Sequence, residues 1–159
     1  MHMPPLQLPR FNAKLKEGQQ GLEILDTYRK KYLKLTPEEW VRQHLLHWLT
    51  DHLGYQAARL SVEKSLNLNG MTRRYDAVWF DASGEKPIIL IECKAAHVEI
   101  NQSVFDQAAR YNLVIDAPFM LLSNGISHYF AKINHQKGQY DLFDHVPEAA
   151  AIPSLLLTA

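Results

Sequence analysis

The sequence predicts an α/β fold, a mixed β-sheet of four or five strands flanked by helices on both faces. Residues 88–91 form a continuous apolar run, which is typical of a central strand covered on both sides. Apolar residues recur at helical spacing over 37–53 and over 102–115, on either side of that run in the chain. A second apolar run, 119–122, follows the second helix, and the order strand, helix, strand predicts a parallel pair.

Length and composition predict one domain over 1–159. With 159 residues, 47% of them hydrophobic, the chain can bury one good core. We expect an irregular segment over 1–20, the core of the fold over 22–135, and a C-terminal hairpin and tail over 136–159. A single cysteine excludes an internal disulfide. With no signal-peptide pattern and no apolar run long enough to cross a bilayer, we expect a cytoplasmic location and no membrane contact.

The clearest helix signal follows an ambiguous stretch. Residues 22–35 fit either a short strand with a basic connector or a helix. Thr36 as N-cap, Pro37 at the first helical position and Glu39 three residues after the cap then form a capping box. The sequence predicts that this helix ends near Gly54.

Turn residues divide the next stretch into three antiparallel strands. Strands over 60–68 and 72–80 are joined by the hairpin turn Asn69-Gly70. Ser83-Gly84 joins the second of them to the central strand.

The C-terminal half supplies the second helix and a final hairpin. The predicted inward stripe of the helix over 102–115 is Val104, Ala108, Tyr111 and Ile115. Strands over 128–133 and 140–143 form a hairpin around Lys137-Gly138. The apolar tail, 152–157, covers either the core or a partner; the sequence does not decide between them.

Ionisable residues cluster where a buried strand should stay apolar. Asp76 and Glu92 lie eight residues before and after Gly84, so they should face each other across the hairpin. Because strand side chains alternate, Lys94 shares a face with Glu92, whereas Cys93 points to the opposite face.

This arrangement suits metal-assisted hydrolysis of a phosphodiester. Asp76 and Glu92, joined by the backbone carbonyl of Cys93, are hard oxygen ligands of the kind that Mg²⁺ prefers, with Mn²⁺ as a substitute. Lys94 would orient or deprotonate the attacking water and offset the developing charge. The competing interpretation of Glu92 and Lys94 is a plain ion pair at a strand end, which stabilises a fold by only about 0–1 kcal/mol.

The first helix offers a further carboxylate. At about 100° per residue, Glu38 falls on the apolar stripe of this helix, and Glu39 lies toward the edge of the stripe. We therefore expect Glu38 to point inward and Glu39 to serve the cap, where the helix dipole favours a carboxylate regardless of function.

The charge balance limits any nucleic-acid contact to local clusters. The formal net charge is zero, with 17 basic and 17 acidic residues, so the chain lacks the field of a tight non-specific DNA binder. Solvated charged faces are the competing interpretation of both basic clusters in the sequence. The candidate contacts are Arg29, Lys30, Lys31 and Lys34, and the pair Arg73 and Arg74.

Five separated motifs resemble, in order, the N-terminal nuclease domain of type I restriction enzyme R subunits, in the PD-(D/E)XK nuclease superfamily. The match spans about residues 22–135. Tyr75 departs from the proline in the superfamily name, and the chain contains no GxxxxGK[ST] loop for a translocating motor. The motifs are TPEEWVRQ at 36–43, RRYD at 73–76, LIECKA at 90–95, FDQAARY at 105–111 and SNG at 123–125.

The resemblance implies a restriction-endonuclease-like fold and a DNA substrate. It implies a catalytic set of Asp76, Glu92 and Lys94, with Glu38 as the helix glutamate that approaches the metal and Glu39 as its alternate. It also implies that Gln107, paired with Tyr111 at i, i+4, supports the site or contacts DNA.

The sequence thus predicts a stand-alone, Mg²⁺-dependent DNA endonuclease. Motor, methylation or specificity subunits are the partners the resemblance implies, and cutting both strands suggests a homodimer or a partner. The alternative from another class is a non-catalytic nucleic-acid-binding or assembly module of a restriction complex. Zero net charge and the missing motor motif favour that alternative.

Overall fold

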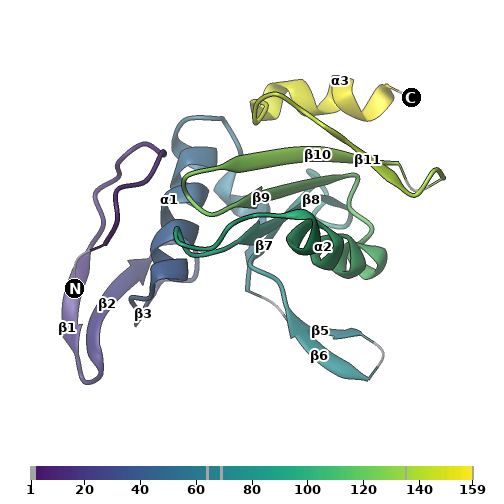
Figure 1. Ribbon diagram of the computed structural model, residues 1–159. Helices are drawn as coiled ribbons and strands as arrows, with labels where there is room; N and C mark the ends of the chain where they lie inside the picture. Colours follow the sequence, from purple (N-terminus) through teal and green to yellow (C-terminus); the bar gives the residue numbers. More distant parts are fainter. Residues whose placement is uncertain (1–2, 64, 69, 135, 159) are drawn as a thin grey trace.

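A six-stranded mixed sheet forms the centre of the protein (Figure 1). The computed structural model describes residues 3–63, 65–68, 70–134 and 136–158. In spatial order the strands are β11 (Gln139–Leu142), β10 (His128–Asn134), β9 (Phe119–Ser123), β8 (Pro87–Cys93), β7 (Ala77–Phe80) and β4 (Leu60–Val62). Strands β8 and β9 are parallel and the other neighbours antiparallel, which confirms the predicted mixed sheet. The sheet exceeds the four or five predicted strands because the β10–β11 hairpin continues it.

Helices cover both faces of the sheet, as predicted. Helix α1 (Pro37–Asp51) packs Val41 and Leu45 onto the face that carries Ile89. Helix α2 (Gln102–Ile115) packs Phe105 onto the face that carries Leu90. No helix among the described residues has both the length and the apolar character needed to cross a membrane.

Residues 3–14 have no regular secondary structure, as expected, but a strand follows inside the segment predicted to be irregular. Strands β1 (Leu15–Gly18), β2 (Gly21–Asp26) and β3 (Lys31–Lys34) form a small antiparallel sheet beside α1 (Figure 1). The pairing also settles the ambiguous stretch 22–35 as strands. β1 is mostly exposed and is held by pairing with β2 rather than by burial, so it lacks the apolar alternation that would predict it.

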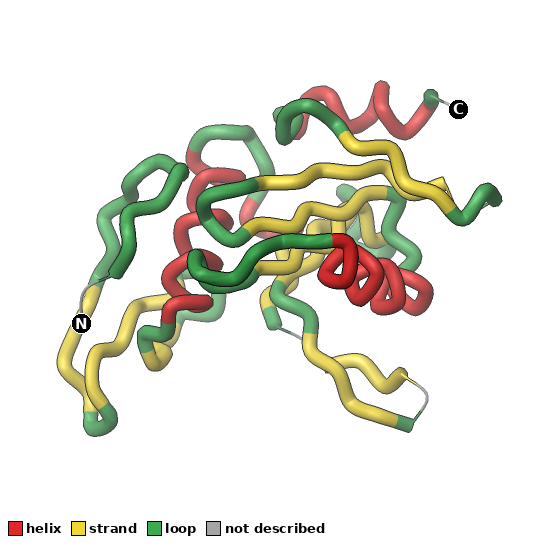
Figure 2. The backbone as a smooth tube through the Cα atoms, viewed as in Figure 1, coloured by secondary structure: helices red, strands yellow, loops and turns green. Residues whose placement is uncertain are grey.

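Two of the predicted long strands are each broken in the middle. The predicted strand 60–68 divides into β4 and β5 (Ser65–Leu68), and 72–80 divides into β6 (Met71–Arg74) and β7. Glu63 adopts a left-handed φ of 50° at the first break, and its N–H donates to the Asp76 carbonyl over 2.8 Å. Strands β5 and β6 therefore leave the sheet as a separate ribbon (Figure 2). In the predicted turn, Gly70 has φ +78°, and Asn69 lies outside the described residues.

The bounds of α2 match the predicted 102–115, but its buried face is shifted by one residue. The buried residues are Phe105, Ala108 and Asn112, whereas Tyr111 is only partly buried. Asn112 is inside because its side chain accepts from the Ala117 N–H over 2.9 Å and donates to the Ala117 carbonyl over 2.8 Å. Hydrophobic periodicity does not register a polar residue buried in this way.

The C-terminal tail covers the core of its own chain. The short helix α3 (Ile152–Leu157) directly follows a single-turn helix, η2 (Ala149–Ala151). Another single-turn helix, η1 (Ala57–Arg59), lies between α1 and β4. Ile152 is buried in the cluster on the α1 side of the sheet, and Leu155 packs against that cluster. This contact settles the choice between core and partner for Ile152.

Candidate active site

The β7–β8 register brings the two predicted carboxylates together. Ala77 pairs with Ile91, so the next residue outward on each side is Asp76 and Glu92. Glu92 lies two residues beyond Leu90 in β8, which faces α2, and alternation places Glu92 on that face. Asp76 lies at the bend just before β7.

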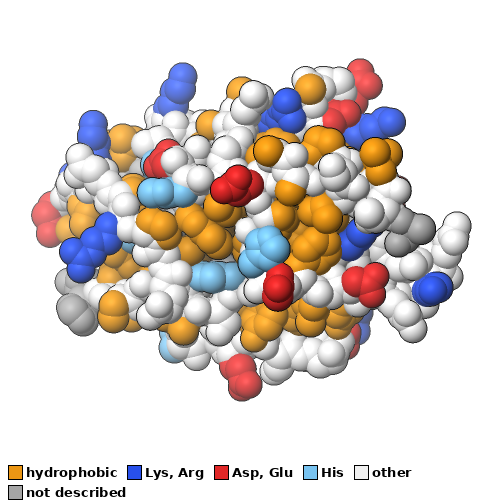
Figure 3. Space-filling model, turned by 90° about the horizontal axis from the view of Figure 1, so that it is seen from above, with side chains coloured by type: hydrophobic (Ala, Val, Ile, Leu, Met, Phe, Trp, Pro, Cys, Tyr) orange, Lys and Arg blue, Asp and Glu red, His pale blue; other side chains and the backbone are white. Residues whose placement is uncertain are grey.

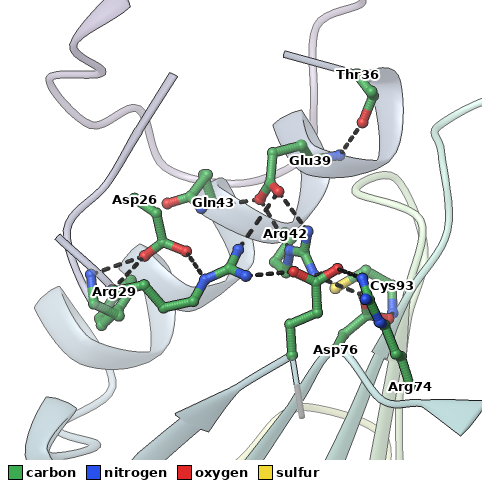
Figure 4. Close-up of polar contacts among 11 residues, drawn as sticks. Asp26, Arg29, Thr36, Glu39, Arg42, Gln43, Arg74, Asp76 and Cys93 are labelled. Atoms are coloured by element: carbon green, nitrogen blue, oxygen red, sulfur yellow. Dashed lines mark hydrogen bonds and ion pairs between the residues drawn. The ribbon is translucent and has the colours of Figure 1, made fainter. Parts of the chain in front are cut away.

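Cys93 occupies the opposite face, as predicted. Its side chain is 1% exposed in the cluster that packs against α1, and burial raises the pKa of its thiol well above the ordinary value. Its backbone N–H donates to Asp76 Oδ2 over 2.7 Å (Figure 4). The strand that carries Glu92 therefore also holds Asp76 in place.

Burial destabilises the ionised forms of both carboxylates. Burial raises the pKa of Glu92 well above its usual range, and the adjacent Asp76 carboxylate raises it further. Burial also raises the pKa of Asp76, against the opposing effects of the Cys93 N–H and the Arg42 guanidinium. Glu92 Oε1 is buried with no hydrogen-bond partner among the described residues. Burying a carboxylate oxygen without a hydrogen-bond partner costs free energy. A cation bound at this position would offset that cost.

A cavity of about 320 Å³ lies over the pair. Lys94, at the end of β8, is half-buried in its wall together with Asp76 and Glu92. The ammonium of Lys94 favours the ionised form of both carboxylates, and so lowers the pKa of each against the effect of burial. The structure thus brings together the three predicted central residues. Tyr111 of α2 and Glu38 of α1 also line the cavity, from the two sides of the sheet.

The expected orientation of the helix glutamates is wrong. Glu39 is the buried one, at 4% exposure, and Glu38 is exposed on the cavity wall. Glu39 turns inward because Arg42 Nε donates to it over 2.9 Å and Gln43 Nε2 does so over 2.9 Å. The expected N-cap holds, since the Glu39 N–H donates to Thr36 Oγ1 over 3.0 Å. The site still affects Glu38 electrostatically. Partial burial and, to a smaller extent, the negative charge of Asp76 raise the pKa of Glu38.

A buried ion-pair network in the wall of the cavity was missed by the sequence reasoning. Arg42 Nη1 lies 3.3 Å from Asp76 Oδ1 and 3.6 Å from Glu63 Oε1, and its guanidinium pairs with Glu39 (Figure 4). Arg29, expected in a DNA-contacting cluster, instead pairs with Asp26 and Glu63. The i, i+3 spacings Asp26 to Arg29 and Glu39 to Arg42 are the signal that could have revealed the network.

The predicted nucleic-acid contacts are only partly gathered. Arg74 lines the cavity with its side chain 71% exposed, and its Nη1 lies 3.9 Å from Glu63 Oε1. Arg73 is in β6, but its side chain lies outside the described ones. Lys30 and Lys31 are exposed at the β2–β3 connection and do not line the cavity. On the face seen in Figure 3, the Lys and Arg side chains of the described residues are spread around the margin rather than gathered in one patch.

The Gln-x-x-x-Tyr pair is formed on α2. Gln107 is exposed, and its Nε2 donates to Tyr111 Oη over 3.4 Å, a long hydrogen bond. Tyr111 lines the cavity and Gln107 does not. The pair thus connects the cavity wall with the outer surface of α2.

The donor set fits a hard divalent cation that keeps several waters. Among the described residues, no three His, Cys, Asp or Glu side chains are grouped to hold a metal ion. Two carboxylates, one of them with an unpartnered oxygen, are the kind of partial shell that Mg²⁺ accepts when waters or a backbone carbonyl complete it. The residues present therefore fit Mg²⁺ better than a fully protein-ligated metal such as structural zinc.

Comparisons with known proteins agree with this fold. Residues 37–147, well over half of the chain, match the family model described as type I restriction enzyme R protein N terminus (HSDR_N). The structure is similar, with a TM-score of 0.56 and 17% sequence identity, to a fragment of a putative HsdR subunit of a type I restriction enzyme from Vibrio vulnificus YJ016. The alignment covers 77% of this chain and 25% of that one, so the chain spans about a quarter of its length. No curated protein matches the chain.

The raised pKa of Glu92 predicts how stability depends on pH. In EDTA, the contribution of Glu92 to the free energy of unfolding should be most favourable below the ordinary glutamate pKa of 4.5 and should be lost as pH rises through the higher folded-state value. Glu92→Gln cannot ionise, so its unfolding free energy should depend less on pH and exceed that of the wild type at pH 8. Chemical denaturation at several pH values measures this. The matched control is Glu99→Gln, at an exposed position. Parallel pH profiles for wild type and Glu92→Gln would contradict the burial of an ionisable Glu92.

Proposed function

The chain belongs to the family of type I restriction enzyme R protein N termini, and we propose that it is an endonuclease that hydrolyses DNA phosphodiester bonds with Mg²⁺, or with Mn²⁺ in its place. The observation that carries the proposal is the buried Asp76–Glu92 pair with its unpartnered oxygen, next to Lys94 in one cavity. A nuclease role is also consistent with the family. The PD-(D/E)XK pattern of Asp76, Glu92 and Lys94 supports the same reaction class.

Asp76, Glu92 and the backbone carbonyl of Cys93 would hold the metal ion. When bound, such an ion polarises a phosphoryl oxygen and lowers the pKa of a coordinated water. The protein's share is to keep the two carboxylates together and out of bulk water, where charge interactions are strong. The Cys93 N–H and the Arg42 guanidinium orient Asp76 for this task.

Lys94 would stabilise negative charge at the reacting phosphate, and Glu38 would exchange a proton there. The Lys94 ammonium shares the cavity with both carboxylates, so it can orient the attacking water and offset the negative charge that develops on the phosphate. Glu38 lies exposed on the same wall, where its raised pKa lets it exchange a proton nearer neutral pH. Gln107, through Tyr111, would support the wall from α2.

DNA would reach the cavity past a small set of cationic and aromatic side chains. Arg74 and Tyr111 line the cavity, and Arg73 neighbours Arg74 on β6. Lys30 and Lys31 would contact a more distant part of the backbone. With zero net charge, the chain would bind DNA weakly by itself, which favours work with motor, methylation or specificity subunits, or as a homodimer, in the cytoplasm.

A non-catalytic nucleic-acid-binding or assembly module is the second candidate, and one observation favours it. Both Asp76 oxygens already have donors, since Oδ2 accepts from Cys93 N–H and Oδ1 from Arg42. A carboxylate satisfied in this way has less need of a metal ion. The unpartnered Glu92 Oε1 argues in the other direction and decides our preference.

Cleavage of DNA tests the proposed reaction. We expect the protein to nick supercoiled DNA in Mg²⁺ or Mn²⁺ and to lose this activity in EDTA. Lys94→Ala should lower the rate about 10²- to 10⁴-fold, the usual contribution of a positioned proton-transfer group. Lys86→Ala removes an exposed lysine in the β7–β8 connection and should cleave like the wild type. Cleavage that survives Lys94→Ala would exclude this site; Mn²⁺ binding without cleavage would favour a subunit that needs a partner.

The salt dependence of DNA binding tests the Arg74 contact. In Ca²⁺ or EDTA, Arg74→Ala should weaken binding and lower the slope of log affinity against log salt by about 0.9, as expected when one phosphate contact is lost. Fluorescence anisotropy with a labelled duplex measures both quantities. Lys137→Ala, at an exposed turn between β10 and β11, is the charge-matched control. An unchanged slope in Arg74→Ala would remove Arg74 from the interface.

A further inference from the structure

Arg42 joins three separate parts of the chain in the wall of the candidate site. It projects from α1 with its side chain only 8% exposed. Its guanidinium meets Glu39 on its own helix, Glu63 at the break after β4, and Asp76 before β7 (Figure 4). Three carboxylates around one buried guanidinium form a network in which each member depends on the others.

The contact with Asp76 completes the support of that carboxylate. Oδ2 accepts from the Cys93 N–H over 2.7 Å, and Oδ1 accepts from Arg42 Nη1 over 3.3 Å. The two donors come from β8 and α1, elements that pack on each other through the core. Together they fix both the position and the tilt of the carboxylate. Glu92, whose Oε1 has no partner among the described residues, lacks a second support of this kind.

Arg42 is in turn held by Glu39. Arg42 Nε donates to Glu39 Oε2 over 2.9 Å, and a second, shorter contact joins Nη2 to Oε1. Gln43 Nε2 also donates to Oε2 over 2.9 Å, so the Glu39 carboxylate cannot swing away from the guanidinium without losing both. A bidentate ion pair of this kind fixes the orientation of the guanidinium in addition to balancing its charge.

We propose that Arg42 is a positioning residue that fixes the Asp76 carboxylate for the candidate site, and that Glu39 acts on Asp76 through Arg42. The consequence for metal binding rests on the proposed function; the support of Asp76 does not. Removal of an outer group that orients a metal ligand commonly costs 10- to 100-fold in metal affinity. The inward turn of Glu39, unexpected for a capping residue, follows from this role.

The Cys93 amide reports on Asp76 without any metal. In the wild type its proton resonance should lie downfield, because the N–H donates to a carboxylate over 2.7 Å. In EDTA, Arg42→Gln should move this resonance upfield and reduce the protection of the amide from hydrogen exchange, toward the values of Asp76→Ala. Arg42→Lys keeps the positive charge but loses the bidentate geometry of the guanidinium. Its Cys93 amide shift and exchange protection should therefore lie between those of the wild type and Arg42→Gln.

A double-mutant cycle tests the part assigned to Glu39. Glu39→Gln should shift the Cys93 amide when Arg42 is present and add nothing in the Arg42→Gln background. Mn²⁺ titration calorimetry on the same variants should show affinity lowered about 10- to 100-fold by Arg42→Gln. Asn112→Ala removes two buried hydrogen bonds of α2 away from the cavity, so it controls for loss of stability alone.

The outcomes separate the two proposals. An unmoved Cys93 amide in Arg42→Gln, or an equal shift in Asn112→Ala, would overturn the positioning role. A shifted amide in a protein whose wild type binds no Mn²⁺ would support the positioning role and refute the metal site. If Arg42→Gln does not fold, Glu39→Gln and Arg42→Lys carry the same test, and an unmoved amide in both overturns the proposal.

Discussion

The candidate site depends on the pairing register of β7 with β8, since that register sets Asp76 beside Glu92 and beneath the Cys93 N–H. Both carboxylates are thereby taken out of bulk water, and the Asp76 carboxylate lies close enough to raise the pKa of Glu92. A shift by one residue would send the pair to opposite faces and abolish the site. The break at Glu63, the left-handed turn and the departing β5–β6 ribbon leave the end of this hairpin open to the cavity.

A buried acidic pair carries a cost, and the surrounding structure offsets only part of it. Arg42 and the Cys93 N–H stabilise Asp76, while Glu92 retains an oxygen without a donor. Sites that do chemistry often keep such unfavourable groups, at the expense of stability. A divalent cation bound between Asp76 and Glu92 would offset the remaining cost of burying their negative charge. The Lys94 ammonium offsets part of that cost in the same way.

The sequence was sufficient for those features that follow from local patterns. Counting outward from the Gly84 turn placed Asp76 opposite Glu92, and alternation placed Cys93 on the other face; the structure confirms both. The capping signals located the start of α1 at Pro37. These predictions succeed because hairpin register and strand alternation are set by the nearest residues along the chain.

Features set by partners distant in the chain were missed. The inward turn of Glu39 depends on the buried guanidinium of Arg42, which an apolar stripe does not take into account. Asn112 is buried by its bonds to Ala117, and this shifts the inner face of α2 away from the predicted one. Strand β1 exists because β2 pairs with it, and Arg29 is held by Glu63 from a strand break that no turn signal announced.

The most direct test of the central claim is the position of a bound Mn²⁺ ion in a crystal of the protein, located by its anomalous scattering. We predict one peak about 2 Å from carboxylate oxygens of both Asp76 and Glu92, with the Cys93 carbonyl in the same shell. The Glu92→Gln crystal should lose this peak. A peak elsewhere, or Mn²⁺ bound equally well without the Glu92 carboxylate, would contradict the claim that this pair is a metal site.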